Sequence, residues 1–408
     1  MESGNYLNTY RTKRIKQGIK AKRNHEVITH NPNTIKPGET LYVKIPKLEK
    51  NCLIVPESLK LTFNLTTSSK VSNAVAAANA TFVANVGRNL VERITTKLGG
   101  KSINEFDKAY IYNTFKDFWL TDKQRKNNVL QGVDKSQRQG TDKKDYLVTA
   151  FGEKYCIPLE FELFDDHMPY YSTAIQEALE YNIKFNEAKY VVAGTASTKD
   201  YDIKDIQLEY ETIYSEELAN EIESEYTNGF TYLIDDIHLL RTEAIGKSKR
   251  ININVDVNRK STKGILLFFQ KTFTDYDSEE TPFQNPDITN VTITSEGISH
   301  CIFKSGVKNM HQWGEIKKHF MSENIKKDES CTLDVEKYYG GENFALWIDL
   351  RSTEDNTLHG SGTMMSNIKN GLQLELTRST ETELDMMVYI VADAVVAIQD
   401  CRVINIIH

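Results

Sequence analysis

Eight stretches of this sequence alternate apolar and polar residues with a period of two. In residues 59–66, Leu59, Leu61 and Phe63 alternate with polar side chains, and residues 179–186 follow the same pattern. Successive side chains on a strand point to opposite faces, so the pattern predicts strands with one face in a core. The other six stretches are residues 41–45, 159–163, 206–210, 251–257, 344–350 and 372–376. A chain built in this way is predicted to fold as a β-sandwich.

The stretches fall into two groups on either side of an acidic segment, residues 216–226. Ser215 is a suitable N-cap for a helix there, Glu216 suits the positive end of its dipole, and Gly229 ends it. A length of 408 residues also fits two domains better than one. We therefore expect a basic arm at residues 1–30, a first sandwich at 31–215, a helical connector at 216–229 and a second sandwich at 230–408.

The two halves repeat one order of elements. Residues 157–163, a turn-rich connection and residues 179–185 correspond to residues 344–350, a Gly/Ser-rich loop and residues 372–376. A jelly roll needs about eight strands, which is what each half offers. The predicted fold is all-β, with two eight-stranded antiparallel jelly rolls in tandem and short helices in their loops.

Each half also contains one patch of helical spacing among its strands. In residues 111–119 apolar side chains recur at i, i+4, i+7 and i+8, and residues 313–320 show a similar stripe. The first patch is followed by a long polar stretch, residues 121–145. An excursion of this length in a compact β domain is usually exposed and functional, or flexible.

The first 25 residues carry an unusual concentration of positive charge. No acidic residue occurs between positions 3 and 25, although the whole chain has a net charge of −7. Such an arm could bind a polyanion by counterion release, could lie on an anionic membrane surface, or could be a solvated tail. Its basic residues are Arg11, Lys13, Arg14, Lys16, Lys20, Lys22 and Arg23.

The cysteines and the apolar runs bear on where the chain is found. Five widely spaced cysteines without a CxxC pair indicate free thiols in a reducing compartment. The longest apolar run, residues 386–398, is interrupted by Asp393 and is too short to span a bilayer. The N-terminus lacks the apolar core of a signal peptide, so we expect a protein that is not secreted.

Two segments resemble part of a phosphate-binding loop, residues 99–102 and 246–248. The complete motif needs a glycine five positions before its Gly-Lys pair, because that glycine lets backbone amides surround the phosphates. Thr95 and Arg241 occupy those positions. The sequence therefore does not predict a nucleotide site.

Candidate metal ligands and catalytic groups are scattered. His300, Cys301, His311, His319 and Cys331 lack the tight spacing that brings zinc ligands together. Carboxylates stand next to histidine in two runs, and a third run resembles a nucleophile loop without its GxSxG pattern. Those three runs are residues 165–167, 235–238 and 359–362. We expect no catalytic residue, no cofactor and no metal site.

Several strand and turn segments form a recognisable series. They are residues 82–91, 97–100, 157–161, 166–171, 178–181 and 230–236. In these segments the sequence resembles the double jelly-roll major capsid proteins of Polinton/Maverick-type elements and adinto-like viruses, relatives of the virophage capsid protein and the adenovirus hexon. The shared motifs are structural, and most of them lie in the first half.

The resemblance implies a structural protein of the virion rather than an enzyme. Such proteins form homotrimeric, pseudo-hexagonal capsomers that tile an icosahedral shell, with neighbouring capsomers, penton and minor capsid proteins as partners. The chain would be made in the host cytoplasm or nucleus. Its basic arm would face inward toward genome DNA, an internal membrane or minor proteins. Residues 121–145 and 352–366 would be outer loops or trimer-clasping loops.

One alternative comes from a different class, a carbohydrate-binding or carbohydrate-processing β-sandwich. Such a protein would use aromatic rings to stack on sugars and paired carboxylates to hydrolyse them. Trp119, Trp313 and Trp347 are the rings available, and none of them neighbours a carboxylate pair in the sequence.

Overall fold

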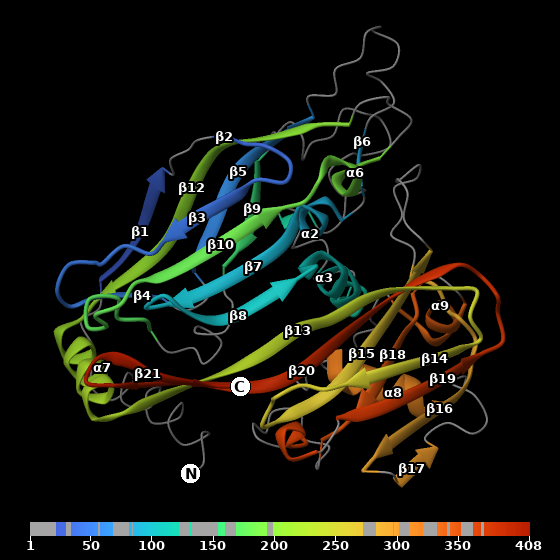
Figure 1. The fold of residues 1–408 in the computed structure, drawn as a ribbon. Coiled ribbons are helices and arrows are strands. Elements are labelled where there is room, and N and C mark those ends of the chain that lie inside the picture. Colours follow the sequence, from blue (N-terminus) through green and yellow to red (C-terminus); the bar gives the residue numbers. More distant parts are fainter. Residues whose placement is uncertain are drawn as a thin grey trace, which may run out of the picture.

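The computed structural model shows two β-sandwiches lying side by side (Figure 1). The structure describes residues 22–29, 34–55, 58–67, 81–83, 85–121, 124, 131–132, 154–159, 169–193, 199–271, 283–296, 298–301, 310–320, 333–340, 343–351, 362–368 and 371–408.

The first sandwich consists of a six-stranded and a four-stranded sheet. The six-stranded sheet has the order β1 (Lys22–Thr29), β12 (Tyr201–Tyr214), β5 (Lys60–Thr67) and β9 (Lys154–Pro158), and β2 (Thr34–Ile35) and β4 (Cys52–Ile54) also pair with β12. The four-stranded sheet has the order β3 (Thr40–Lys44), β10 (Leu179–Phe185), β7 (Val91–Leu98) and β8 (Lys101–Asp107). The short strands β6 (Thr81–Phe82) and β11 (Val192–Ala193) form a separate pair.

The second sandwich is built in the same way. One sheet has the order β13 (Phe230–Gly246), β20 (Leu384–Gln399), β15 (Thr262–Lys271) and β18 (Ala345–Asp349), and β21 (Arg402–Ile407) also pairs with β20. The other sheet has the order β14 (Arg250–Val255), β19 (Leu372–Arg378), β16 (Ile288–Ser295) and β17 (Ile298–Cys301).

The two sandwiches have identical connectivity. If the eight main strands of each are counted along the chain, one sheet has the order first, eighth, third, sixth, and the other has the order second, seventh, fourth, fifth. All of these strand pairs are antiparallel, as in a jelly roll. The predicted tandem double jelly roll is confirmed, and the two elements that echo each other in the sequence are the sixth and seventh strands of each roll.

The helices occupy connections between strands. Those of the first roll are α2 (Val86–Asn89), α3 (Ala109–Asp117) and α6 (Ala188–Val191); those of the second are α8 (Met310–Phe320), α9 (Val335–Tyr339) and the 3₁₀ helix η4 (Met365–Asn367). Both patches of helical spacing are confirmed, because α3 and α8 each follow the fifth strand of their roll. Within the described part of the chain, no helix is both long and apolar enough to cross a membrane.

The connector between the rolls is α7 (Glu216–Asn228), close to its predicted bounds. Ser215 is its N-cap, and the side chain of Ser215 accepts a hydrogen bond from the amide of Leu218. Gly229 follows the helix with φ 118°, a conformation that glycine adopts without strain. On its inner side Leu218 and Ile222 are buried in the core of the first roll.

The strand β1 lies inside the segment that the sequence assigned to the basic arm. Its residues pair in register with β12, from Lys22 opposite Tyr214 to Thr29 opposite Gln207. The sequence of β1 lacks regular alternation, and it is backbone pairing with β12 that makes it a strand. The expected boundary after residue 30 is therefore wrong for Lys22–Thr29, which form the edge of the first roll.

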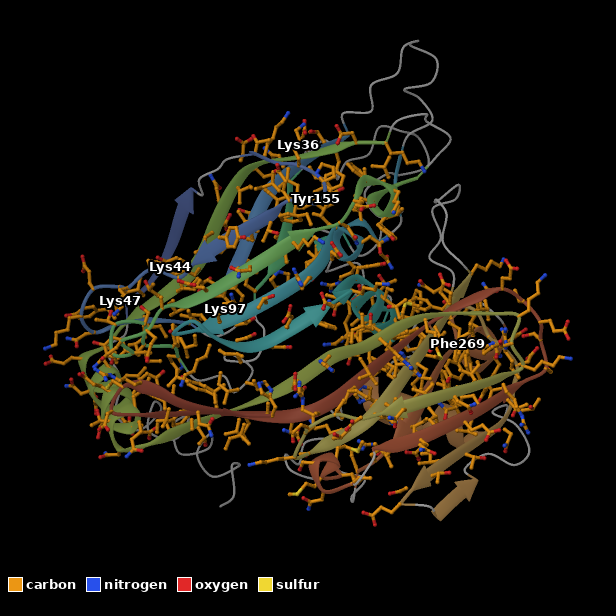
Figure 2. All side chains as sticks on the ribbon, viewed as in Figure 1. Lys36, Lys44, Lys47, Lys97, Tyr155 and Phe269 are labelled. Atoms are coloured by element: carbon orange, nitrogen blue, oxygen red, sulfur yellow. The ribbon has the colours of Figure 1, made fainter. Side chains whose placement is uncertain are left out.

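Buried and more exposed residues alternate along a strand where one face of its sheet is in contact with water. In β10 the buried residues alternate with half-buried ones, and the outward row forms ion pairs with its neighbours. Glu180 lies 3.9 Å from Lys44 on β3, and Lys184 lies 2.8 Å from Glu92 on β7. Figure 2 shows Lys44 extending from this sheet, whereas Phe269 lies within the second roll.

Two strands of the second roll are buried on both faces. Leu266, Leu267 and Phe268 are consecutive residues of β15, and none of them is exposed. The same is true of most of β20 between Met386 and Ala392. A strand covered on both faces is apolar throughout, so something outside the sandwich has to cover this sheet.

Candidate functional site: the interface between the two rolls

The sheet of β15, β18 and β20 in the second roll is covered by α3, a helix of the first roll. Its apolar stripe is buried in the core of the second roll, together with β15, β18 and β20. Lys108 precedes the helix with φ 48°, which turns the chain sharply from β8 into α3. Figure 1 shows α3 between the two sandwiches.

The contact that α3 makes is aromatic. The ring of Phe115 lies 5.1 Å from Phe268, 5.5 Å from Phe283 and 5.2 Å from Phe320, measured between centroids. These rings meet edge to face, an arrangement worth about 0.5–1.5 kcal/mol per pair beyond the burial of area. Tyr112 extends the cluster toward β20, and its hydroxyl lies 3.4 Å from Nε2 of His319.

The attachment of α3 is reinforced by a buried ion pair. Arg88 on α2 donates from Nε to Asp117 at 2.8 Å and from Nη2 at 3.2 Å. Burial by itself would lower the pKa of the Arg88 guanidinium, but the Asp117 carboxylate raises it above its ordinary value. Arg88 also reaches Gln131, and the amide of Gly87 donates to the carbonyl of Gly132 at 3.2 Å. The pair therefore holds α3 to the body of the first roll.

The second roll makes a reciprocal contact with the first. The distal part of β20 and the strand β21 contribute Ala394, Val396, Ile398 and Val403 to the core of the first roll. Both rolls are therefore completed by residues from the other half of the chain.

The turn between β20 and β21 is held from two sides. Asp400 and Cys401 have positive φ values of 50° and 57°. The amide of Cys401 donates to Tyr226 at 3.1 Å, and its carbonyl accepts from Gln176 at 3.0 Å. These contacts join the end of α7, the turn and the first roll into one body.

The segment that resembles a phosphate loop also belongs to this contact. Gly99 and Gly100 form the tight turn between β7 and β8, with φ values of 63° and 74°. Nζ of Lys101 donates to the carbonyl of Val403 at 3.0 Å and to that of Ile404 at 3.1 Å. Lys101 thus fastens β21 to the first roll.

Solved structures of viral capsid proteins are similar to this chain over both rolls. No family model matches the chain, and no curated protein matches it in sequence. The PBCV-1 virus capsid is similar with a TM-score of 0.62 at 12% identity, covering 93% of this chain and 95% of that chain. The Faustovirus major capsid protein has a TM-score of 0.61 at 9% identity, covering 97% and 98%. The mavirus major capsid protein has a TM-score of 0.52 at 9% identity, covering 94% and 89%.

This chain has the double jelly-roll fold of viral major capsid proteins. The similarity spans both rolls and the connector, because more than nine-tenths of the chain is covered in each comparison. Sequence identities of 9–12% show that the fold is shared, but they assign no role to any individual residue of this chain.

The acidic run at residues 235–238 is structural in this double jelly roll. Asp235 and Asp393 both contact Nζ of Lys263, at 2.8 and 2.6 Å, and Ser261 donates to Asp393 at 2.7 Å. Burial would lower the pKa of Lys263, but the two carboxylates raise it above its ordinary value. The three strands β13, β15 and β20 are joined at this point.

The next residue of that run is also paired. Asp236 is 2% exposed and lies 2.6 Å from Arg259 and 3.3 Å from His408. Burial would raise the pKa of the Asp236 carboxyl, but the hydrogen bond from His408 and the charge of Arg259 hold it below its usual range. Asp236 is the partner of these cations, which accounts for its burial.

The candidate metal ligands do not converge within the described residues. His319 stacks on Trp347 with 4.0 Å between ring centroids, and burial lowers its pKa to about 3. His300 and Cys301 lie on β17, His311 lies on α8, and Cys331 lies outside the described residues. Among described side chains no group of three or more His, Cys, Asp or Glu residues could hold a metal ion.

The rings required by the carbohydrate alternative lie in the interior of this double jelly roll. Trp119, Trp313 and Trp347 are 1%, 9% and 1% exposed. Trp119 stacks on Trp313 at 5.1 Å. A ring buried in this way presents no face to a sugar, so no observation favours that alternative.

Several sequence-based expectations lie outside the described residues. These are Arg11, Lys13, Arg14, Lys16, Lys20, residues 165–167 and 352–361, and most of residues 121–145. Lys22 and Arg23 are the two basic arm residues that the structure includes, in β1. The interface between the two rolls was not predicted from the sequence, although the aromatic stripe at residues 111–119 is the part of the sequence that forms it.

Proposed function

We propose that this protein is a structural major capsid protein whose homotrimers form pseudo-hexagonal capsomers of an icosahedral viral shell. The observation that carries the proposal is the joining of two identically connected jelly rolls into one body by α3 and β21. Three such bodies supply six similar rolls, and six similar units can close a ring when the step between them is regular.

Two further observations support the proposal. The fold extends over nearly the whole chain and over nearly the whole of the PBCV-1 and Faustovirus capsid proteins. The buried charged groups Arg88, Asp236 and Lys263 are held in ion pairs, and His319 lies against the ring of Trp347, which suits a scaffold. We therefore assign no catalytic step to this chain.

The proposal extends to partners and location. The protein would contact further copies of itself, penton and minor capsid proteins within the virion, after synthesis in the host cytoplasm or nucleus. The basic arm, now residues 1–21, would face the interior of the shell and contact genome DNA or an internal membrane. The first roll would then run from residue 22 to 215, with the second after α7.

Size-exclusion chromatography with light scattering tests the proposal. We expect a species of three times the chain mass of 46.7 kDa, and hexagonal blocks or shells in negative stain. A folded protein that stays at 46.7 kDa at every concentration and ionic strength tried would contradict it.

A further inference from the structure

Lys263 on β15 is a buried lysine of the second roll. It is 7% exposed, and no other lysine among the described residues is buried. Lysine is almost never fully buried unless it is paired, because its ammonium group is costly to remove from water. The other buried ion pairs described above use arginine, whose guanidinium does not lose its proton in proteins. At Lys263, by contrast, a buried ion pair contains an amine that can react once it has lost a proton.

A β-bulge determines where the side chain of Lys263 points. The register of β15 on β20 shifts between Thr262 and Gly264, so Lys263 is the extra residue. A bulge changes the direction of a side chain relative to the regular pleat. Gly264 fixes the bulge, because a Cβ at this position would lie 2.3 Å from the ring of Trp347. The position of the lysine is therefore set by the packed backbone of the sheet.

Two carboxylates contact the amine of Lys263. Asp235 on β13 and Asp393 on β20 lie directly opposite each other, an arrangement of like charges that destabilises a sheet. Nζ of Lys263 lies 2.6 Å from Oδ1 of Asp393 and 2.8 Å from Oδ1 of Asp235. The side chain of Asp393 is 5% exposed and that of Asp235 is 51% exposed. One carboxylate is therefore enclosed, and the other can exchange protons with water.

Ser261 holds the enclosed carboxylate in position. Its hydroxyl donates to Oδ2 of Asp393 at 2.7 Å and accepts from the amide of Gly362 at 3.1 Å. The amide of Asp393 also donates to the carbonyl of Ser261 at 2.8 Å. Ser261 thus binds one carboxyl oxygen while the other faces the amine. A donor at Oδ2 stabilises the negative charge that develops there when the carboxyl carbon is attacked.

We propose that Lys263 and Asp393 condense to an amide, an isopeptide bond that joins β15 to β20 covalently. An ammonium–carboxylate pair contains the atoms of the amide plus one water molecule, so the reaction needs no other reactant. Contact with the carboxyl group and enclosure in the sheet supply the proximity that such a reaction requires.

Asp235 provides the route for the proton. Burial would lower the pKa of Lys263, but the carboxylates raise it above its ordinary value, so the proton leaves to the bonded Asp235 and not to water. The nitrogen lone pair then attacks the carboxyl carbon of Asp393, and the C–N bond forms. The bond from that carbon to Oδ1 breaks, and Oδ1 leaves as water with the proton from Asp235 and a second proton from the nitrogen. Oδ2 remains as the amide oxygen, bound to Ser261.

The amide removes both charges from the interior and leaves Asp235 at the boundary with water. It forms once in each chain, so it gives the second roll a permanent cross-link and no enzymatic turnover. A cross-link between residues distant in the sequence stabilises a fold by restricting the unfolded chain. The reaction takes place within one chain and does not depend on the proposed capsomer.

Mass spectrometry of the intact full-length chain tests the proposal. After incubation of the folded protein, we expect a mass below the sequence mass by one water molecule. Trypsin does not cleave after an acylated lysine, so a branched peptide should join the segments around Lys263 and Asp393. Lys263→Arg keeps the cation and should retain the full mass. Lys249 is the internal control, because it lies 2.7 Å from Glu381 in an exposed pair and should stay unlinked.

Two further variants assign the roles of the carboxylates. Asp393→Asn should form the same amide with loss of ammonia instead of water, and it serves as the second variant if Lys263→Arg fails to fold. Asp235→Asn should slow the reaction by about a hundredfold or more, because the proton acceptor is lost. A folded wild-type chain that keeps its full sequence mass contradicts the proposal, and so does a branched peptide that joins Lys263 to Asp235. A cross-linked chain that never forms trimers would leave this inference intact and contradict the proposed function.

Discussion

Trp119 stacks on Trp313 with ring centroids 5.1 Å apart, although the two residues belong to different rolls. Trp119 is the last residue of the aromatic stripe 111–119, Trp313 is the first residue of the stripe 313–320, and the two rolls meet where these stripes pack together. Because all three tryptophans lie in this region, their fluorescence reports directly on the contact between the rolls.

Phe115→Ala is expected to destabilise the whole chain. Phe115 is fully buried among aromatic rings of the second roll, and truncation of such a residue costs about 3–5 kcal/mol. Urea unfolding followed by tryptophan fluorescence measures this change. Tyr42→Ala on β3 is the control, because Tyr42 is 66% exposed and its loss should cost less than about 1 kcal/mol. Equal costs at the two positions would show that α3 does not support the interface.

Asp117→Asn is expected to be strongly destabilising because it leaves the buried guanidinium of Arg88 without its carboxylate. Removal of one partner of a buried ion pair costs about 3–5 kcal/mol. The double variant Arg88→Met/Asp117→Leu should recover much of that loss, since no charge then remains buried. Urea unfolding of Asp117→Asn, of the double variant and of its two single variants, Arg88→Met and Asp117→Leu, checks both statements. Additive effects of Arg88→Met and Asp117→Leu would refute the coupling.

Stability is expected to fall as the pH drops below about 6.5, through His319. Its folded pKa is lowered to about 3, so between these values the unfolded chain binds a proton that the folded chain does not. The contribution of neutral His319 to the free energy of unfolding is complete above pH 6.5. It is lost on acidification, by roughly 1 kcal/mol per pH unit.

Urea midpoints measured between pH 7.5 and 4.5 test this dependence. Replacement of His319 by Phe removes the titrating group and keeps a ring beside Trp347. The variant should show a flatter pH profile than wild type, and an unchanged profile would assign the dependence to other groups.

Deletion of residues 1–21 is expected to leave the fold intact but to weaken shell assembly and binding to DNA or anionic vesicles. Deletion of residues 1–29 also removes β1, the edge partner of β12, and should lower the melting temperature. Circular dichroism and salt-dependent binding measure the two effects. If deletion of residues 1–21 alone unfolds the first roll, the arm is part of the sandwich.

Local patterns were sufficient to predict several of the individual elements. The alternation around Leu61 and Tyr181, the N-cap Ser215 and the stripe containing Phe115 depend only on neighbours a few residues away, and all of them appear as predicted. The repeated order of elements also predicted two rolls with the same connectivity.

The sequence by itself therefore determined that the chain folds as two jelly rolls joined by one helix. Only the tertiary structure decided how they are joined: α3 packs on the second roll, β21 packs on the first, and β1 becomes a strand through β12. The physical reason is distance along the chain. Phe115 and Phe268, or Lys101 and Val403, are neighbours only in space, and no periodic pattern in either segment records its distant partner.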